Sequence, residues 1–359
     1  MHAVIHRSEK AFGAGMMPVA GKPLIARQLQ WLRAWGHGPV AVELGTDSTS
    51  DEIARWLQEE DAIGVGVTLV TSRRALTPRE LARRAGFSED VSLLAVPEDV
   101  VILGDLGPAL DAAGERGALI RAFAPGALDG ALEGAELSIV SGAGDDIEVS
   151  ITAEGGNAVR VRTPADALSL SVAALRGDLG DGASAARGIL IHAAEVEPGI
   201  WMGRGVLVEP GAVLRAPLLL GAHSVVCRGA EVGPSVCVGN RAVIEAETKV
   251  RSSLIRAGTI VGEELCLDGL AVDPEGVIDL STGARTLVCD SLILASRDAG
   301  RMVELSPLVL EIVVLVVVTP LTLLVQLVTL AFAGAREAFP LEIGRGSDPG
   351  YDPALIELS

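Results

Sequence analysis

Histidine, cysteine and lysine, three side chains that often act as nucleophiles or general bases, are scarce in this sequence. Its 359 residues include five histidines and four cysteines, and lysine occurs only at positions 10, 22 and 249. Neither a Cys-x-x-Cys pair nor a Cys/His cluster with metal-site spacing occurs, so we expect reduced, structural thiols. Lys22, Asp99 and His223 are left as isolated candidates for chemistry, and their roles depend on the elements that hold them. The cysteines are Cys227, Cys237, Cys266 and Cys289.

The strongest pattern in the chain is an aliphatic residue at every sixth position between Val196 and Val250. Neither an α-helix, with a period of 3.6, nor a simple strand, with a period of 2, produces this repeat. A coil with short flat sides does, because each hexad then places one aliphatic side chain inside. The sequence therefore predicts a parallel β-helix over residues 187–300, in preference to a β-sandwich rich in Ala, Gly and Val. The repeated positions are Val196, Met202, Val208, Leu214, Leu220, Val226, Val232, Val238, Ile244 and Val250.

The phase of this repeat becomes irregular after Val250. We expect an insertion around Asp268–Ala284 and a last coil at Leu287–Leu294. The end of such a coil exposes strand edges and core aliphatics, which need a cap or a neighbour. Self-association into a homo-oligomer through the β-helix is the simplest expectation.

Residues 1–180 alternate short apolar runs with helical patterns, which is typical of βαβ units. Thr77-Pro78-Arg79-Glu80 combines an N-cap, a proline and a carboxylate, and Thr163-Pro164 begins a second helix that reaches about Arg176. We expect an α/β sheet with helices on both faces. The expected strands are His2–Ile5, Val40–Leu44, Val65–Val70, Leu93–Val96, Val100–Leu103 and Ala118–Phe123, and the other expected helices are Pro23–Trp35 and Asp51–Glu59.

A second long apolar stretch, Leu308–Ala333, lies near the carboxyl end. As one helix, its 26 residues would span about 39 Å, enough to cross the ~30 Å hydrocarbon layer of a bilayer. Pro320 interrupts the run and would kink the helix. We expect a membrane segment over 303–335, either spanning or re-entrant, followed by a tail at 336–359; a buried core helix is the alternative.

The charge balance narrows the classes of partner. The chain has 29 basic and 47 acidic residues, a net charge of −18. This balance argues against nucleic acid, which requires positive charge, and solubility is the simpler reading of it. Residues 1–10 lack the apolar run of a signal peptide, so we expect the amino-terminal part at the cytoplasmic face of the membrane.

Three stretches resemble known families. "PVAGKPLI", followed by "QLQWLRAWG", resembles the sugar-nucleotide nucleotidyltransferases, the nucleotide-sugar pyrophosphorylases. The hexad array resembles the left-handed parallel β-helix of hexapeptide-repeat proteins. The interrupted apolar segment around Pro320 resembles the membrane helix of polyprenyl-phosphate sugar-1-phosphate transferases. Together these resemblances imply an α/β, Rossmann-like nucleotidyltransferase domain, a left-handed β-helix and a carboxyl-terminal membrane helix or hairpin.

The pyrophosphorylase resemblance implies roles for particular residues. Gly21, Lys22 and Pro23 would bind substrate, Lys22 and Asp99 would be the catalytic candidates, and Asp99 would hold Mg²⁺ if the protein is active. The chain departs from the family pattern, because the glycine-rich phosphate loop expected between Ile5 and Pro18 is shortened. Arginine occupies positions 160 and 162, where the family's second metal-binding carboxylate is expected, and a guanidinium would repel a metal ion.

These departures favour a membrane-tethered, pyrophosphorylase-like protein of polysaccharide or glycoconjugate biosynthesis that has lost catalysis and keeps a binding, regulatory or scaffold role. Its expected partners are a nucleotide sugar or sugar phosphate and the membrane, through 308–333. An active sugar-1-phosphate nucleotidyltransferase with altered phosphate contacts is the first alternative. A hexapeptide acyltransferase, with His223 as the general base, and an oligomeric scaffold are the others.

Overall fold

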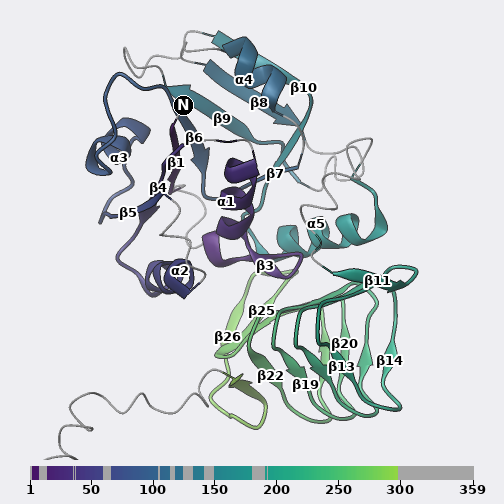
Figure 1. Ribbon diagram of the computed structural model, residues 1–359. Helices are drawn as coiled ribbons and strands as arrows, with labels where there is room; N and C mark the ends of the chain where they lie inside the picture. Colours follow the sequence, from purple (N-terminus) through teal and green to yellow (C-terminus); the bar gives the residue numbers. More distant parts are fainter. Residues whose placement is uncertain are drawn as a thin grey trace, which may run out of the picture. The chain divides into compact units, whose positions relative to one another are not determined.

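The computed structural model (Figure 1) describes residues 2–7, 14–34, 36, 38–59, 66–103, 106–113, 118–123, 132–140, 149–179, 191 and 193–297. These lie in one compact unit, 1–299. Lys10, His192, the expected membrane segment 303–335 and the tail 336–359 fall outside the described residues. Within the described ranges, no helix is long and apolar enough to cross a membrane.

The amino-terminal part is built on a mixed eight-stranded sheet in the order β5-β4-β1-β6-β9-β8-β10-β7. The four strands β5, β4, β1 and β6 are parallel, and β1 pairs with β4 on one side and β6 on the other. The direction of winding therefore changes beside β1. The strands are β1 (His2–His6), β4 (Val40–Leu44), β5 (Val67–Thr71), β6 (Leu93–Pro97), β7 (Val100–Ile102), β8 (Ala118–Phe123), β9 (Glu136–Val140) and β10 (Val149–Arg160).

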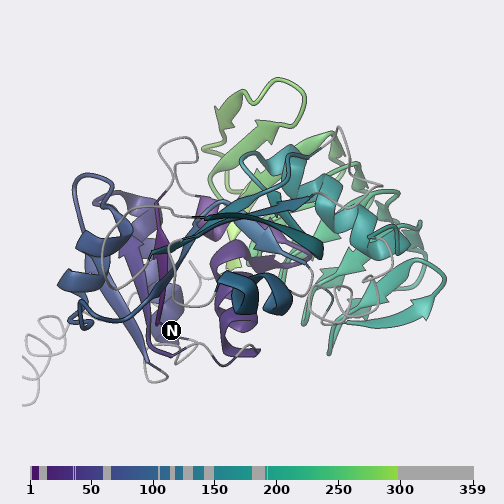
Figure 2. The same ribbon diagram turned by 90° about the horizontal axis from the view of Figure 1, so that it is seen from above.

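Helices cover both faces of this sheet, as expected. Alternate residues of β1 belong to different clusters: Ala3 and Ile5 pack with α1 (Leu24–Ala34), α2 (Ser48–Glu59) and α4 (Gly107–Ala113), whereas Val4 packs with α3 (Pro78–Arg84). Figure 2 shows the purple β1 running between α3 and α1. The period of two in strand side chains produces this division. Strands β9 and β10 were not among the expected elements.

Both predicted helix starts have the expected chemistry. Thr77 caps α3 and Thr163 caps α5 (Pro164–Arg176), each in a reciprocal capping box with the acidic residue three positions later. Proline follows the cap in both helices, where its missing N–H costs nothing. Helix α5 ends at Gly177, whose φ of 87° is left-handed. These local signals placed both ends of α5 correctly.

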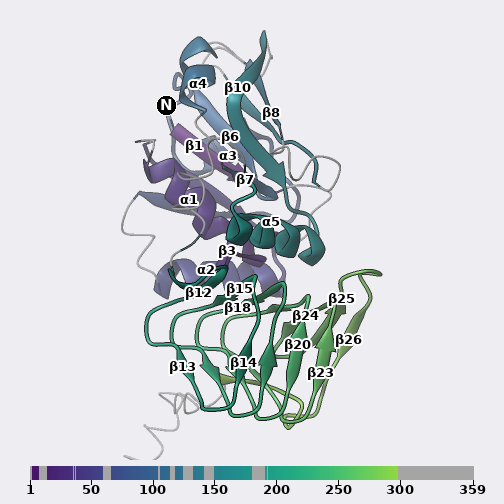
Figure 3. The same ribbon diagram turned by 90° about the vertical axis from the view of Figure 1, so that its right-hand side faces the viewer.

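The second half of the described chain is a parallel β-helix. Three sheets receive one strand from each successive coil, and the register advances 18 residues between Leu220 and Val238 and between Val226 and Ile244. Figure 3 shows the coils side by side, stacked along an axis that runs from β13 on the left towards β26 on the right. The six anchors from Leu220 to Val250 are completely buried, which confirms the hexad interpretation. The sheets contain β12 (Ile200–Met202), β15 (Leu218–Leu220), β18 (Val236–Val238), β21 (Leu254–Ile255) and β24 (Leu270–Asp273); β13 (Leu207–Val208), β16 (Val225–Val226), β19 (Val243–Ile244) and β22 (Thr259–Val261); and β14 (Val213–Leu214), β17 (Glu231–Val232), β20 (Lys249–Arg251) and β23 (Cys266–Asp268).

The two ends of the array differ from the expectation. Val196 lies in β11 (Ala194–Glu197), antiparallel to β12, and is 51% exposed, so it is not a core anchor. After Val250 the register advances by 17 residues, as between Val238 and Ile255, which explains the irregular phase. The expected last coil is wrong as well: β25 (Gly276–Asp279), β26 (Arg285–Leu287) and β27 (Leu294–Ser296) all pair antiparallel with their neighbours.

Candidate functional site

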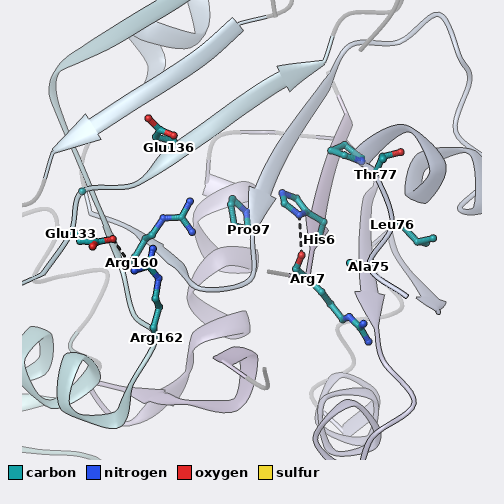
Figure 4. A pocket seen from close by; sticks show the side chains of 12 residues that line it. His6, Arg7, Ala75, Leu76, Thr77, Pro97, Glu133, Glu136, Arg160 and Arg162 are labelled. Carbon is teal, nitrogen blue, oxygen red and sulfur yellow. Dashed lines mark hydrogen bonds and ion pairs between the residues drawn. The ribbon is translucent and has the colours of Figure 1, made fainter. Parts of the chain in front are cut away.

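A cavity of about 680 Å³ lies at the carboxyl ends of the central strands (Figure 4). Its walls include His6, the last residue of β1, and Pro97, the last residue of β6, which are paired in the sheet. In open α/β sheets, ligands bind in the crevice where the winding direction changes. The cavity occupies that position between β1 and β6.

Two arginines line this cavity and share a buried carboxylate. Arg160 Nη1 donates to both carboxylate oxygens of Asp99, at 3.1 and 2.9 Å, and Arg162 Nε lies 3.6 Å from Asp99 Oδ2. The Asp99 side chain is fully buried, while the side chains of Arg160 and Arg162 are 20% and 30% exposed. In Figure 4, the Arg160 side chain points toward Pro97 from one wall of the cavity, and His6 lies on the other side of Pro97. The carboxylate thus lies behind the arginines, which form part of the cavity surface.

The turn that carries Asp99 is held from two directions. Gln28 Nε2, on α1, donates to the carbonyl oxygens of Pro97 and Val100 at 2.7 and 2.9 Å. The Asp99 carbonyl oxygen accepts a hydrogen bond of 2.7 Å from the N–H of Val161. The first contacts fix the turn between β6 and β7, and the last ties it to the segment that carries both arginines. The fold therefore fixes the turn that carries Asp99 and the segment that carries the two arginines.

A second buried carboxylate supports the opposite wall. Glu43, on β4, accepts hydrogen bonds from the backbone N–H groups of Arg7 at 3.0 Å and Leu76 at 2.9 Å. Burial raises the pKa of this carboxyl, and the two hydrogen bonds oppose that rise. Burial also lowers the pKa of His6, with a smaller opposing effect from Asp99. His6 is therefore kept neutral more readily than an exposed histidine.

The arrangement can hold an anion through hydrogen-bond donors. Arg160 uses only Nη1 on Asp99, and neither Nε nor Nη2 has an acceptor in the described part of the chain. Arg162 Nε is buried without an acceptor among the same residues, and its Nη1 pairs with Glu133, whose side chain is 70% exposed. Exposed ion pairs are weak and screened, so Glu133 is a poor competitor for an incoming anion.

The same arrangement does not fit a divalent cation. Magnesium requires nearly octahedral oxygen ligands at about 2.0–2.1 Å. The Asp99 oxygens instead accept from a guanidinium, and a second guanidinium lies beside them. Within the described ranges, no group of three or more His, Cys, Asp or Glu side chains is placed to hold a metal ion. The metal role expected for Asp99 stays a prediction that this geometry disfavours.

Gly21, Lys22 and Pro23 form part of a hairpin rather than a wall of the cavity. Strands β2 (Pro18–Val19) and β3 (Lys22–Pro23) pair antiparallel, with φ of 45° at Ala20 and 80° at Gly21 in the turn. Positive φ at both central residues is typical of tight hairpins and explains the glycine. The predicted substrate residues are therefore not among those that line the cavity, and their role stays a prediction.

The hairpin packs against the β-helix through a shared core. A Cβ at Gly21 would lie 3.4 Å from Cδ2 of Leu219. The buried Arg27 donates to the carbonyl oxygens of Val19 and Ala20, and Ser171 Oγ accepts from the Ala20 N–H at 2.8 Å. One apolar cluster joins the hairpin and α5 to strands of the β-helix. The glycine of the "PVAGKP" motif therefore has a structural role in this fold.

His223 occupies a corner of the β-helix. Its φ of 59° is left-handed, a conformation typical of a tight turn. Its backbone N–H donates to Arg204, and its carbonyl oxygen accepts from Arg297. It lines neither the main cavity nor a smaller one of about 290 Å³ that Arg162 also borders. A role as an acyltransfer base stays untested.

Sequence reasoning missed the cavity's most informative pair. Arg160 and Asp99 are 61 positions apart, so no local pattern connects them. The available signal was the presence of arginine at 160 and 162 together with the apolar run Leu93–Pro97 that precedes Asp99. All four cysteines are unpaired, but only Cys237 is buried, and Cys266 and Cys289 are exposed.

Among known proteins, solved structures of low similarity match this chain. No family model matches the chain, and no curated protein matches it. Among solved structures, HddC from Yersinia pseudotuberculosis complexed with GMP-PN is 11% identical, with a TM-score of 0.36, over 48% of this chain and 98% of that one. A putative glucose-1-phosphate thymidylyltransferase from Bacillus anthracis, in complex with a sucrose, is 11% identical, with a TM-score of 0.34, over 52% and 94%. At these values neither likeness determines what this chain does.

Proposed function

We propose that this chain is a nucleotide-sugar pyrophosphorylase-like protein that binds a phosphate-bearing ligand, a nucleotide sugar or a sugar phosphate, without transferring a nucleotidyl group. The observation that carries the proposal is the pairing of Asp99 with Arg160 and Arg162 at the switch point of the sheet. Guanidinium groups match the oxygen geometry of phosphates, which supports this ligand class. The cavity, at about 680 Å³, lies within the range of about 300–1,000 Å³ usual for small-molecule sites.

The loss of transfer follows from the occupation of Asp99. Phosphoryl-type transfer depends on cations that neutralise the charge developing on the phosphate oxygens, and metal ions usually bridge those oxygens. A carboxylate whose oxygens are hydrogen-bonded to Arg160 has to break a buried ion pair before it can bind a metal. Breaking such a pair costs several kcal/mol. Binding without turnover is the function that this geometry supports best.

The cellular setting is the part of the proposal that rests on sequence alone. The apolar residues 308–333 would anchor the protein at the cytoplasmic face of a membrane, where polysaccharides or glycoconjugates are assembled. The β-helix would then be a rigid spacer through which copies of the chain associate. Detergent dependence of solubility, lost when 303–359 is removed, is the expected sign of the anchor; a fully soluble intact chain would contradict it.

A ligand panel tests the binding function. The full-length chain would be melted in the presence of nucleotide sugars and sugar-1-phosphates, and a ligand at a hundredfold excess over Kd should stabilise it by about 2.7 kcal/mol. Arg160→Gln should lose this stabilisation. Arg83→Gln is the matched control, because Arg83 is 70% exposed, pairs with Glu89 and does not line the cavity.

A pyrophosphate-release assay over sugar phosphates and nucleoside triphosphates tests the absence of turnover. We expect no Mg²⁺-dependent release. Robust release that Lys22→Ala or Asp99→Ala abolishes would instead establish the active nucleotidyltransferase.

A further inference from the structure

The residues around Asp99 also indicate which groups neutralise the charge of the bound phosphate. In the resembled enzymes a divalent cation would neutralise the phosphates at this point, but here Asp99 is fully buried against Arg160 and close to Arg162. The two arginines already supply permanent positive charge at the carboxyl edge of the sheet. A metal would have to displace one arginine and approach the other.

We propose that Arg160 and Arg162 replace the metal, so that the cavity binds a phosphate or diphosphate group in a metal-independent manner. The inference rests on the proposed binding function and specifies its chemistry. Asp99 is then a positioning residue that touches the arginines and not the ligand. Arginine suits this role because its charge is permanent and its donors form a rigid fork.

The hydrogen-bond donors of the two arginines support the replacement of a metal ion by these side chains. Arg160 spends one nitrogen on Asp99 and keeps Nε and Nη2 without an acceptor among the described residues. Arg162 Nε faces Asp99 at 3.6 Å, so this arginine contributes its charge and its outer nitrogens. An incoming phosphate oxygen would give the two Arg160 donors an acceptor. Charge-assisted hydrogen bonds from guanidinium to phosphate are among the strongest in proteins.

The positions of the donors are fixed before any ligand arrives. Arg160 ends β10, opposite Val100 in the sheet, and Arg162 lies two residues before Pro164, the first residue of α5. The Asp99 carboxylate orients the Arg160 guanidinium, and the Val161 N–H bond to Asp99 sets the backbone between the two arginines. A preorganised pair of guanidinium groups loses little entropy when it binds an anion.

Calorimetric titration with inorganic pyrophosphate tests the proposal on the full-length chain. We expect the same Kd in EDTA and in excess MgCl₂. Arg160→Gln and Arg162→Gln should each weaken binding about ten- to a hundredfold, the value of a hydrogen bond to a charged group. Arg83→Gln should leave Kd unchanged, and Arg160→Lys, which keeps the charge but loses the fork, should fall between the wild type and Arg160→Gln.

The outcomes distinguish failure of the metal replacement from failure of the proposed binding function. Binding that appears only with Mg²⁺ would overturn the metal replacement and leave the binding function standing. Absence of pyrophosphate binding in both conditions would overturn both. Circular dichroism of each variant distinguishes lost binding from lost folding, and an Arg160→Gln protein that folds and binds normally would also overturn the inference.

Discussion

The buried pair of Arg160 and Asp99 makes a strong prediction about stability. Arg160→Met leaves the fully buried Asp99 carboxylate with only Arg162, whose Nε lies 3.6 Å away. Removing one partner of a buried pair costs about 3–5 kcal/mol because an uncompensated charge is left behind. Since Arg162 offsets part of that charge, we expect a loss of about 3 kcal/mol, a large part of the roughly 5–15 kcal/mol that stabilises a typical domain.

The double variant isolates the charge effect. In Asp99→Asn/Arg160→Met no buried carboxylate is left unpaired, so its loss should be only about 1 kcal/mol, about 2 kcal/mol less than that of Arg160→Met. Urea unfolding followed by tryptophan fluorescence is the assay, because Trp31 is 1% exposed within the core of the α/β part. The single variant should shift the midpoint by about 1 M or more. A loss below about 1 kcal/mol, or a double variant as unstable as Arg160→Met, would refute the reasoning.

Three further predictions follow from other parts of the fold. Burial lowers the pKa of His6, so the unfolded chain takes up its proton more readily; stability should fall as pH drops below about 6.5, and His6→Asn should flatten that part of the profile in pH-dependent urea unfolding. Gly221→Ala should destabilise the β-helix by about 1–3 kcal/mol, measured by thermal melting, because a Cβ there would lie 2.5 Å from backbone atoms of the next coil. Exposed Cys266 and Cys289 should react with a thiol reagent in the native protein, whereas Cys237, buried and with its pKa raised to about 12, should react only on unfolding.

A control variant or a contradicting result accompanies each of these three predictions. An unchanged acid limb in His6→Asn would show that other groups set the pH dependence. Leu207→Ala, at a 55% exposed position of the β-helix, should cost less than about 0.5 kcal/mol, and an equal loss in both variants would argue against a close approach at Gly221. Native labelling of Cys237 would contradict its place in the shared core.

Periodicity and capping made much of this fold predictable. The hexad spacing depends only on the next few residues, so Leu220 to Val250 could be placed inside the coil from sequence, and Thr77 and Thr163 mark helix starts by local chemistry. Val196 keeps the spacing but belongs to an antiparallel strand. Whether a neighbouring strand is parallel or antiparallel is a tertiary property that a repeat cannot reveal.

The site was less predictable for the same reason. Asp99 and Arg160 meet because β7 and β10 are antiparallel neighbours, a pairing that joins segments far apart in the chain. The sequence placed arginine near the expected metal carboxylate and so pointed to a departure from the family chemistry. It could not show that the same arginine would hold Asp99. Lys22, singled out by its motif, lies in a hairpin whose neighbouring glycine contacts the β-helix.

The most direct measurement is a crystal structure of the chain soaked with a nucleotide sugar in the presence of MgCl₂. We predict phosphate density within hydrogen-bond distance of the Arg160 and Arg162 guanidinium groups, with the Asp99 pair intact. A magnesium ion coordinated by Asp99 with Arg160 displaced, or a ligand held at Lys22 instead of the arginines, would contradict the account.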